Sequence, residues 1–228
     1  MKIYACKIVP DLEKEEVCIT LLDKNRRKKV EAMSSNAKKI QSIQAGLLLR
    51  YAYIQERGAT GWEQVEVSKT ENGKPYFENE PDLFFSISHS AQYCVVVLSN
   101  IPVGIDIEKK KDAKERIAQR FFTPEEKERF TNCDEDKKQE LFYEIWCAKE
   151  ACCKISGMGI SRGLNRLCVI DDTKALDKIE KKHMLLKSYS DIKDYQCICA
   201  VQEDDYLKNN MRFADKIQIL DIEILTKV

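Results

Sequence analysis

The sequence lacks a net charge and a long apolar run. Its 228 residues hold 38 Lys and Arg against 38 Asp and Glu, which gives a formal net charge of zero. General binders of nucleic acids or anionic membranes usually carry a basic surplus, so this balance argues against both classes and leaves room only for a local basic pocket. No segment approaches the roughly 18 apolar residues of a membrane-spanning helix. Lys2 and Lys7 interrupt the apolar start, so we expect no signal-peptide core there.

Histidine is scarce, and the cysteines lack the spacing of common metal sites. The chain has two His and ten Cys. The closest cysteines, Cys152 beside Cys153 and Cys197 near Cys199, do not form the C-x-x-C pairs of zinc or redox sites. A zinc site of Cys and His is therefore disfavoured. We expect free thiols in a reducing cytoplasm, not a disulfide framework.

Three familiar signatures are also missing. The sequence has no G-x-S-x-G elbow, no Walker loop and no G-x-G-x-x-G segment, which disfavours α/β-hydrolases and the common nucleotide-binding folds. The run Ser88-His89-Ser90 cannot form a catalytic triad alone. We interpret it as a polar, exposed strand end that could bind an anion.

The same order of elements occurs twice along the chain. Between Ile40 and Ile54, apolar residues recur at spacings of three and four, which predicts a long helix with a cap near Ser35 and an end at Gly58. A second long helix is predicted over residues 139–156. Strands are predicted over residues 2–9, 84–88, 93–99, 103–108, 166–170, 184–189, 195–201 and 217–225.

These elements predict an α+β fold. The length allows one large domain or two small ones, and 43% hydrophobic residues suffice for a core. Short links between consecutive strands favour antiparallel sheets. We expect two pseudo-symmetric halves, residues 1–104 and 105–228, each with a long helix packed on a small antiparallel sheet.

Two carboxylates share one face of a predicted strand. Asp106 and Glu108 alternate with Ile105 and Ile107, so both acids point the same way. Adjacent carboxylates repel each other unless a cation lies between them, and oxygen ligands suit Mg²⁺. The alternative is an ordinary solvated strand face.

A third acid lies on the second predicted helix. Glu150 and Lys154 are four residues apart and therefore neighbours on one helix face. They are either an ordinary surface ion pair, which stabilises little, or a further metal ligand with a cation placed over a phosphate. Upstream, Thr123 and Glu126 have the spacing of a helix capping box, with Pro124 at the first helical position.

Taken in order, these segments resemble the 4′-phosphopantetheinyl transferase superfamily, and more closely its larger, surfactin-synthetase-activating (Sfp-type) branch. The resemblance covers the motifs between residues 73 and 159 and the total length of the chain. The matching segments are Gly73-Lys74-Pro75, Phe85-Ser86-Ile87-Ser88-His89-Ser90, Pro102-Val103-Gly104-Ile105-Asp106-Ile107-Glu108, Phe142-Tyr143, Trp146, Lys149-Glu150-Ala151, Lys154 and Gly157-Met158-Gly159.

The resemblance implies an enzyme that moves the phosphopantetheine arm of coenzyme A onto a serine of an acyl- or peptidyl-carrier protein. The other product would be adenosine 3′,5′-bisphosphate, and the reaction would need Mg²⁺ or Mn²⁺. By resemblance, Asp106, Glu108 and Glu150 hold the metal. Glu150 takes the serine proton, and Lys154 contacts a phosphate. The family's architecture implies a cytoplasmic monomer with coenzyme A in a cleft between the halves, and no nucleic-acid or membrane partner.

The resemblance also implies coenzyme A contacts. The matching positions are Lys28, Lys74, Pro75, Ser88 and His89. Lys28 lies in a basic cluster, and Arg26 or Arg27 could make the same phosphate contact instead. The sequence alone does not decide which of the three residues aligns with the family's phosphate lysine. Gln41 stands where the family often has an arginine that grips the 3′-phosphate.

Two residues near the motifs have divided interpretations. Glu126 matches a family acid that approaches the active site, and it also completes the capping box; the two roles are compatible. We interpret Lys149 as a solvated helix residue, with a family contact as the alternative.

Two other functions compete with the transferase. The first is a relative of the family that binds coenzyme A without transferring its arm. The second is a metal-dependent phosphoesterase that uses the same acidic cluster. The complete set of carboxylates and Lys154 favours the transferase. The choice of carrier protein and the tolerance for acylated coenzyme A are not encoded in any short motif.

Overall fold

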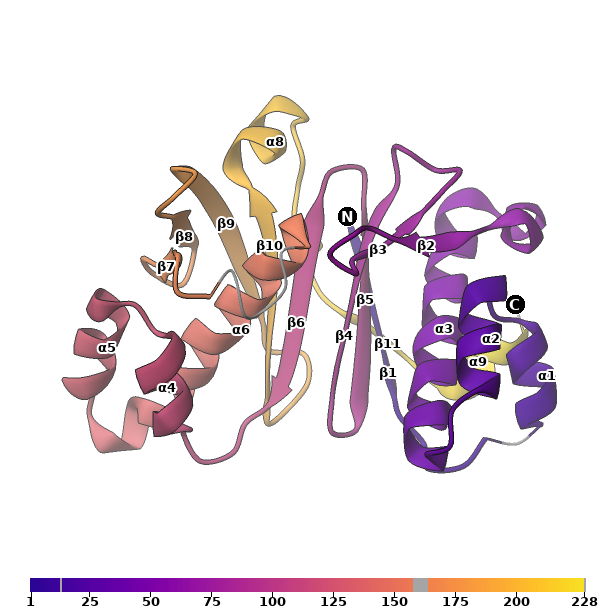
Figure 1. Ribbon diagram of the computed structural model, residues 1–228, viewed down its shortest axis with the longest axis horizontal. Helices are drawn as coiled ribbons and strands as arrows, with labels where there is room; N and C mark the ends of the chain where they lie inside the picture. The colour runs from indigo at the N-terminus through magenta and orange to yellow at the C-terminus, as the bar shows by residue number, and fades with distance from the viewer. Residues whose placement is uncertain (13, 158–163, 228) are drawn as a thin grey trace.

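Two helix-and-sheet halves lie side by side in the computed structural model, which describes residues 1–12, 14–157 and 164–227 (Figure 1). The first half has a four-stranded sheet in the order β11-β1-β5-β4, against which helix α3 (Asn36–Arg57) packs. The second half has a five-stranded sheet in the order β6-β10-β9-β8-β7 with helix α6 (Lys138–Ser156) packed on it. The predicted α+β class is confirmed.

The remaining elements fill in the two halves. In the first half they are β1 (Lys2–Lys7), α1 (Glu15–Thr20), α2 (Lys24–Glu31), η1 (Ala59–Gln64), β2 (Val67–Lys69), β3 (Pro75–Phe77), β4 (Phe84–Ser90), β5 (Tyr93–Ser99), β11 (Gln218–Leu220) and α9 (Ile222–Lys227). In the second half they are β6 (Val103–Lys109), α4 (Glu115–Phe121), α5 (Pro124–Thr131), η2 (Glu135–Lys137), β7 (Leu167–Val169), β8 (Lys174–Asp177), β9 (Lys182–Tyr189), β10 (Tyr195–Gln202) and α8 (Glu203–Lys208).

Both predicted long helices are present. Helix α3 follows the N-cap Ser35 and ends at Gly58, and its apolar stripe, including Ile43 and Leu47, is buried. Helix α6 covers the second sheet with Ile145 on its buried side. Burial of these stripes, not intrinsic propensity, supplies most of the stability of such helices. In the described part of the chain, no helix is both long and apolar enough to cross a membrane.

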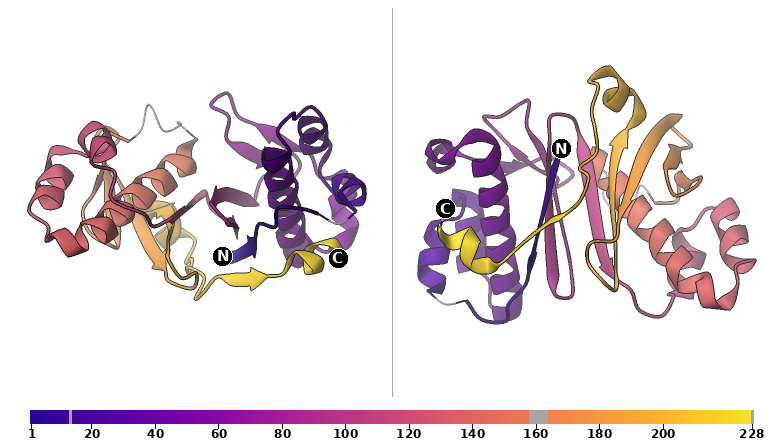
Figure 2. Two further views of the ribbon diagram at one scale, coloured as in Figure 1. Left: turned by 90° about the horizontal axis from the view of Figure 1, so that it is seen from below. Right: turned by 180° about the vertical axis from the view of Figure 1, so that it is seen from behind.

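The C-terminal segment returns to the first half. The prediction of one strand over residues 217–225 is wrong: β11 ends at Leu220, and α9 follows. Strand β11 pairs with β1 in parallel, and Leu225 is fully buried in the core of the first half (Figure 2, right). Short apolar runs fit strand and helix alike, which explains the error. Residues 218–227 therefore pack outside the half that we expected for 105–228.

The two halves meet along strands β4 and β6, which belong to different sheets. Between the sheets lies a shared apolar core, to which β1 and β5 contribute Ile3 and Val97 and β6 and β10 contribute Ile107 and Cys199. Strand β6 begins at Val103, so the proposed division after residue 104 falls inside a strand. The division itself stays a prediction.

Candidate active site

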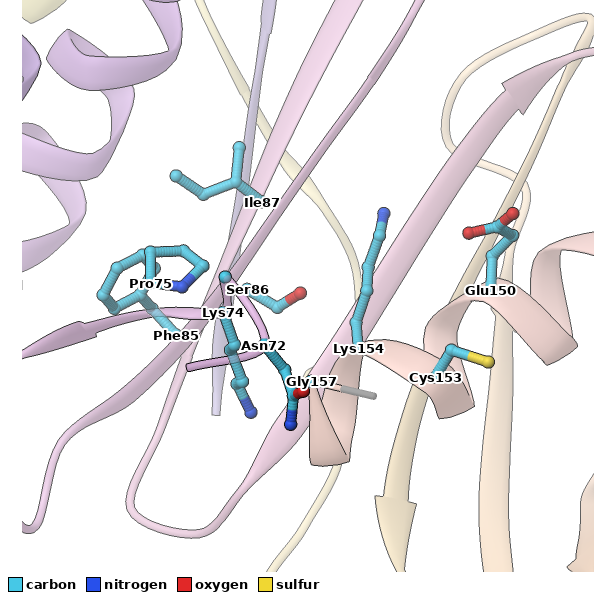
Figure 3. A pocket seen from close by; sticks show the side chains of 11 residues that line it. Asn72, Lys74, Pro75, Phe85, Ser86, Ile87, Glu150, Cys153, Lys154 and Gly157 are labelled. Atoms are coloured by element: carbon cyan, nitrogen blue, oxygen red, sulfur yellow. The ribbon is translucent and has the colours of Figure 1, made fainter. Parts of the chain in front are cut away.

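Helix α6 crosses directly over strand β6. At Gly104, an added Cβ would overlap the carbonyl oxygen of Ala151, so only glycine permits this approach. The two elements are in extensive contact. This packing places Glu150 and Lys154, which extend in the same direction from α6, next to the acidic face of β6 (Figure 3).

Asp106 lies at the centre of this contact. Its side chain is 6% exposed, and its Oδ1 accepts hydrogen bonds from Lys154 Nζ at 2.8 Å and Ser88 Oγ at 2.7 Å. Lys154 Nζ also donates to the carbonyl oxygen of Ile105 at 3.0 Å. Among the described residues, the second carboxylate oxygen of Asp106, Oδ2, is buried and has no hydrogen-bond partner of normal geometry, although the buried Cys147 thiol interacts with this carboxylate. A buried anionic oxygen without a donor is costly, and such an oxygen is suited to coordinate a cation.

The pKa of Glu150 is shifted by its surroundings, which include the acidic residues of β6. Burial, with the negative charges of Asp106 and Glu108, raises its pKa to about 7, while the positive charge of Lys154 opposes the rise. Glu108 is half-buried, and its Oε2 accepts a hydrogen bond from Ser90 Oγ at 2.6 Å. Three carboxylates thus repel one another with one nearby ammonium group.

These carboxylates fit a divalent cation in chemistry. Within the described residues, no three Asp, Glu, His or Cys side chains are already gathered around a common point. The orphaned Oδ2 of Asp106 and the raised pKa of Glu150 nevertheless mark a surplus of negative charge that a cation would relieve. The donor set consists only of oxygens, which suits Mg²⁺ or Mn²⁺.

A cavity of about 230 Å³ opens beside this cluster, and both halves line it (Figure 3). The lining residues of the first half are Asn72, Gly73, Lys74, Pro75, Phe85, Ser86 and Ile87. Those of the second half are Glu150, Cys153, Lys154 and Gly157. A ligand in this cavity would therefore contact both halves at once, as is common for sites between domains.

Lys74 connects the β2–β3 hairpin to the end of α6. Its Nζ donates to the carbonyl oxygen of Ile155 at 2.5 Å, and burial lowers its pKa to about 8. Gly157 ends α6 with a φ of 69°, and a Cβ there would lie 2.7 Å from Lys74 Cβ. Glycine is therefore required for both the left-handed turn and the approach of the lysine. Met158 and Gly159, the rest of that motif, lie outside the described residues.

A second, basic cavity of about 400 Å³ lies on the other side of Pro75, which lines both. Arg26, Lys29 and Lys69 line it, together with Asp23, Asn25, Val67 and Ser68. Partial burial and the charges of Arg26 and Lys69 lower the pKa of Lys29. Lys28, our choice from the sequence, is exposed on α2 and does not line this cavity. Of the three residues that the sequence offered, Lys28, Arg26 and Arg27, only Arg26 lines this cavity, and the choice among them stays a prediction.

The two predicted phosphate contacts on β4 point in different directions. Ser88 is buried and donates to Asp106, whereas His89 is exposed. Alternation along the strand separates them. Their roles toward coenzyme A stay predictions.

Glu126 and Lys149 form a buried pair on the far side of α6. The capping box is confirmed: Thr123 and Glu126 bond reciprocally at the start of α5. The interpretation of Lys149 as solvated is wrong, because its side chain is fully buried and its Nζ donates to Glu126 Oε2 at 2.6 Å and to Leu167 O at 2.5 Å. Glu126 Oε1 accepts from the Val169 amide at 2.7 Å.

Sequence reasoning gave no role to two serines of β4. The side chains of Ser86 and Ser90 accept hydrogen bonds from the β6 amides of Ile105 and Lys109 at 3.2 Å and 3.1 Å. The available signal was the two-residue spacing of Ser86, Ser88 and Ser90, which puts three hydroxyls on one strand face.

The chain matches two protein-family models that meet between β5 and β6. Residues 9–101 match the N-terminal part of 4′-phosphopantetheinyl transferases, and residues 102–206 match the 4′-phosphopantetheinyl transferase superfamily. The transferase psf-1 of Bacillus pumilus is 31% identical over 180 residues, which is 72% of each chain. This chain belongs to the 4′-phosphopantetheinyl transferase superfamily.

Further relatives agree with this family. The 4′-phosphopantetheinyl transferase Sfp of Bacillus subtilis strain 168 is 30% identical over 74% of this chain and 76% of its own. Another Bacillus subtilis 4′-phosphopantetheinyl transferase is 28% identical over 90% and 94%. The predicted Sfp-type membership and the enzyme class, a phosphopantetheinyl transferase, are confirmed.

Proposed function

We propose that this phosphopantetheinyl transferase moves the phosphopantetheine arm of coenzyme A onto a serine hydroxyl of an acyl- or peptidyl-carrier protein, with Mg²⁺ or Mn²⁺, and releases adenosine 3′,5′-bisphosphate. One observation carries the proposal: Asp106 has a buried, unpartnered oxygen beside Glu150. Glu150 and Lys154, which donates to Asp106, line a cavity formed by the two halves of the chain.

Asp106, Glu108 and Glu150 are our proposed metal ligands. A metal ion held there would neutralise the negative charge of the coenzyme A pyrophosphate and of the departing bisphosphate. Lys154, whose ammonium already lies 2.8 Å from Asp106, would turn toward a phosphate oxygen as a point charge.

Glu150 is also our candidate base. In the proposed reaction the serine oxygen attacks the phosphorus atom attached to pantetheine, and the bond from that phosphorus to the bisphosphate oxygen breaks. The serine proton passes to Glu150, directly or through a water molecule. A carboxylate placed beside the attacking hydroxyl is a suitable general base for this proton.

The nucleotide end of coenzyme A would extend from the first cavity to the second. Pro75 lines both, and its neighbour Lys74 lines the first. Arg26, Lys29 and Lys69 offer three cations for the 3′-phosphate. Lys28, Ser88 and His89 remain candidates for the same group of contacts.

We further propose a monomer that works in the cytoplasm. Nine of the ten cysteines, all but Cys133, are buried. Burial raises the pKa of thiols such as Cys197, so they stay protonated and unreactive. Chains rich in unpaired cysteines are typical of reducing compartments.

Intact-mass spectrometry of apo carrier proteins tests the proposed reaction. Each carrier is incubated with the protein, coenzyme A and Mg²⁺, beside a control with EDTA. A gain of roughly 340 Da, the mass of the covalently attached arm, that disappears with EDTA is the expected result. Coenzyme A that binds but is not transferred to any carrier would indicate a binding relative, and its cleavage without a carrier would indicate a phosphoesterase.

A further inference from the structure

Three serines of β4 form a stripe along the edge that faces β6. We call Ser86, Ser88 and Ser90 the serine stripe. Their side chains replace a backbone ladder between two edge strands that belong to different sheets. Ser86 Oγ accepts from the Ile105 amide at 3.2 Å, and Ser90 Oγ accepts from the Lys109 amide at 3.1 Å. Hydroxyl groups of the first half thus satisfy backbone donors of the second.

Two members of the stripe also hold the acidic residues of β6. Ser88 Oγ donates to Asp106 Oδ1 at 2.7 Å, and Ser90 Oγ donates to Glu108 Oε2 at 2.6 Å. Both pairs are 18 residues apart in the chain, because β4 and β6 run in the same direction with one register. Each carboxylate therefore meets its own hydroxyl.

The direction of the Ser90 hydroxyl is fixed by its two bonds. A hydroxyl has one proton to donate and two lone pairs that accept. Because Ser90 Oγ accepts from Lys109 N, its single proton is free to point at Glu108. Hydrogen bonds to a carboxylate are among the stronger ones, so this contact restricts the rotation of Glu108.

The stripe leaves one oxygen of each carboxylate available. Asp106 Oδ1 is used by Ser88 and Lys154, whereas Asp106 Oδ2 is buried without a partner. Glu108 Oε2 is used by Ser90, and no hydrogen bond to Glu108 Oε1 is found within the described residues. The free oxygens are the ones that remain to bind a cation.

We propose that Ser88 and Ser90 are positioning residues that fix Asp106 and Glu108 for the divalent metal. This inference rests on the metal assignment of the proposed function and extends it across the domain junction. A strand of the first half sets the geometry of ligands in the second, so metal affinity depends on the β4–β6 contact. Groups that orient metal ligands commonly change metal affinity by about 10- to 100-fold when removed.

The test measures Mn²⁺ affinity by electron paramagnetic resonance with saturating coenzyme A. Ser90→Ala is expected to weaken Mn²⁺ binding about tenfold, and Ser90→Thr, which keeps the hydroxyl, is expected to restore it to within about twofold. Ser86→Ala is the matched control, because it removes a β4–β6 hydrogen bond that reaches no carboxylate. Its Mn²⁺ affinity should stay within about twofold of the original.

Three outcomes separate the possibilities. A folded Ser90→Ala variant that binds Mn²⁺ as well as the unmodified protein overturns the inference. Equal weakening by Ser86→Ala and Ser90→Ala also overturns it, since the effect would then come from loosening the junction. If the unmodified protein binds no Mn²⁺ in the presence of coenzyme A, the metal assignment of the proposed function is wrong, and this inference is wrong with it. Transfer to a carrier in the mass assay tests the proposed reaction independently.

Discussion

Two lysines of helix α6 pair with carboxylates, and the two pairs differ in exposure and in hydrogen bonding. Lys149 and Glu126 are fully buried, and every oxygen of Glu126 has a donor. Lys154 and Asp106 lie at the cavity, and Asp106 keeps one buried oxygen without a donor. The two lysines are five residues apart on α6. One pair has all of its hydrogen bonds, and the other leaves one carboxylate oxygen without a donor. Completeness of hydrogen bonding and the partial exposure of Lys154 distinguish the structural pair from the candidate functional pair, whereas their formal charges are the same.

The largest effect is expected when the Lys154–Asp106 pair is broken. Asp106→Ala should lower the rate of carrier modification by about 1,000-fold, a loss of roughly 4 kcal/mol of transition-state stabilisation. The fold should persist, because Lys154 keeps its hydrogen bond to the carbonyl oxygen of Ile105 and the repulsion between Asp106 and Glu150 is removed. Mass spectrometry of the carrier measures the rate, and circular dichroism checks the fold. An active Asp106→Ala enzyme would contradict the metal assignment.

Breaking the complete pair should instead affect stability. Lys149→Met leaves the Glu126 carboxylate buried without its cation, which typically costs about 3–5 kcal/mol of unfolding free energy. Urea unfolding measures the loss. Adding Glu126→Gln should recover much of it, because the buried charge is then gone. If Lys149→Met left the stability unchanged and abolished turnover, the pair would have a role in the reaction and not in stability.

The pKa of Glu150 predicts a pH dependence that joins stability to function. Its folded pKa is raised from the model-peptide value of 4.5 to about 7. Between these values the folded protein keeps a proton that the unfolded chain releases. The unfolding free energy of the metal-free protein therefore falls as pH rises through this window, by up to about 3 kcal/mol for this group. Glu150→Gln should remove that decline, so the variant is more stable than the original at about pH 8 and similar at about pH 4.

Urea unfolding in EDTA at several pH values measures this effect. Mg²⁺ affinity should show the opposite trend: it should fall by up to about tenfold per pH unit below 7, because the metal and the proton compete for Glu150. An unfolding free energy of Glu150→Gln that declines with pH just as the original does would refute the assignment.

The smallest effect is expected away from the carboxylates. His89 is exposed on β4 beside buried Ser88. His89→Ala should raise the KM for coenzyme A by about five- to tenfold and leave kcat within about twofold, as expected for contact with a remote phosphate. Steady-state kinetics with varied coenzyme A separates the two constants. A large loss of turnover at saturating coenzyme A would show that His89 acts on the reacting groups.

Local patterns in the sequence predicted the acidic cluster well. Alternation put Asp106 and Glu108 on one face of a strand, and the four-residue spacing put Glu150 and Lys154 on one face of a helix. Both features depend only on neighbours in the chain. The resemblance supplied the step that these patterns cannot, namely that β6 and α6 lie against each other.

Long-range pairing explains what was missed. Lys149 lies on the apolar side of α6, but its partner Glu126 is 23 residues away, and nothing local shows that the two meet. The choice among Lys28, Arg26 and Arg27 depends on how α2 faces the β2–β3 hairpin. Similarly, the return of β11 to β1 joins residues more than two hundred positions apart. Sequence periodicity shows which face of a helix or strand is apolar, but it does not show which faces pack against each other.

The return of residues 218–227 to the first half has a consequence for how the protein is made. Until those residues leave the ribosome, β1 lacks a strand on one edge, and the core beside α3 lacks the Leu225 side chain. Exposed strand edges and incomplete cores invite aggregation and chaperone binding. The nascent first half would therefore wait, partly unfolded, for the second half to be synthesised.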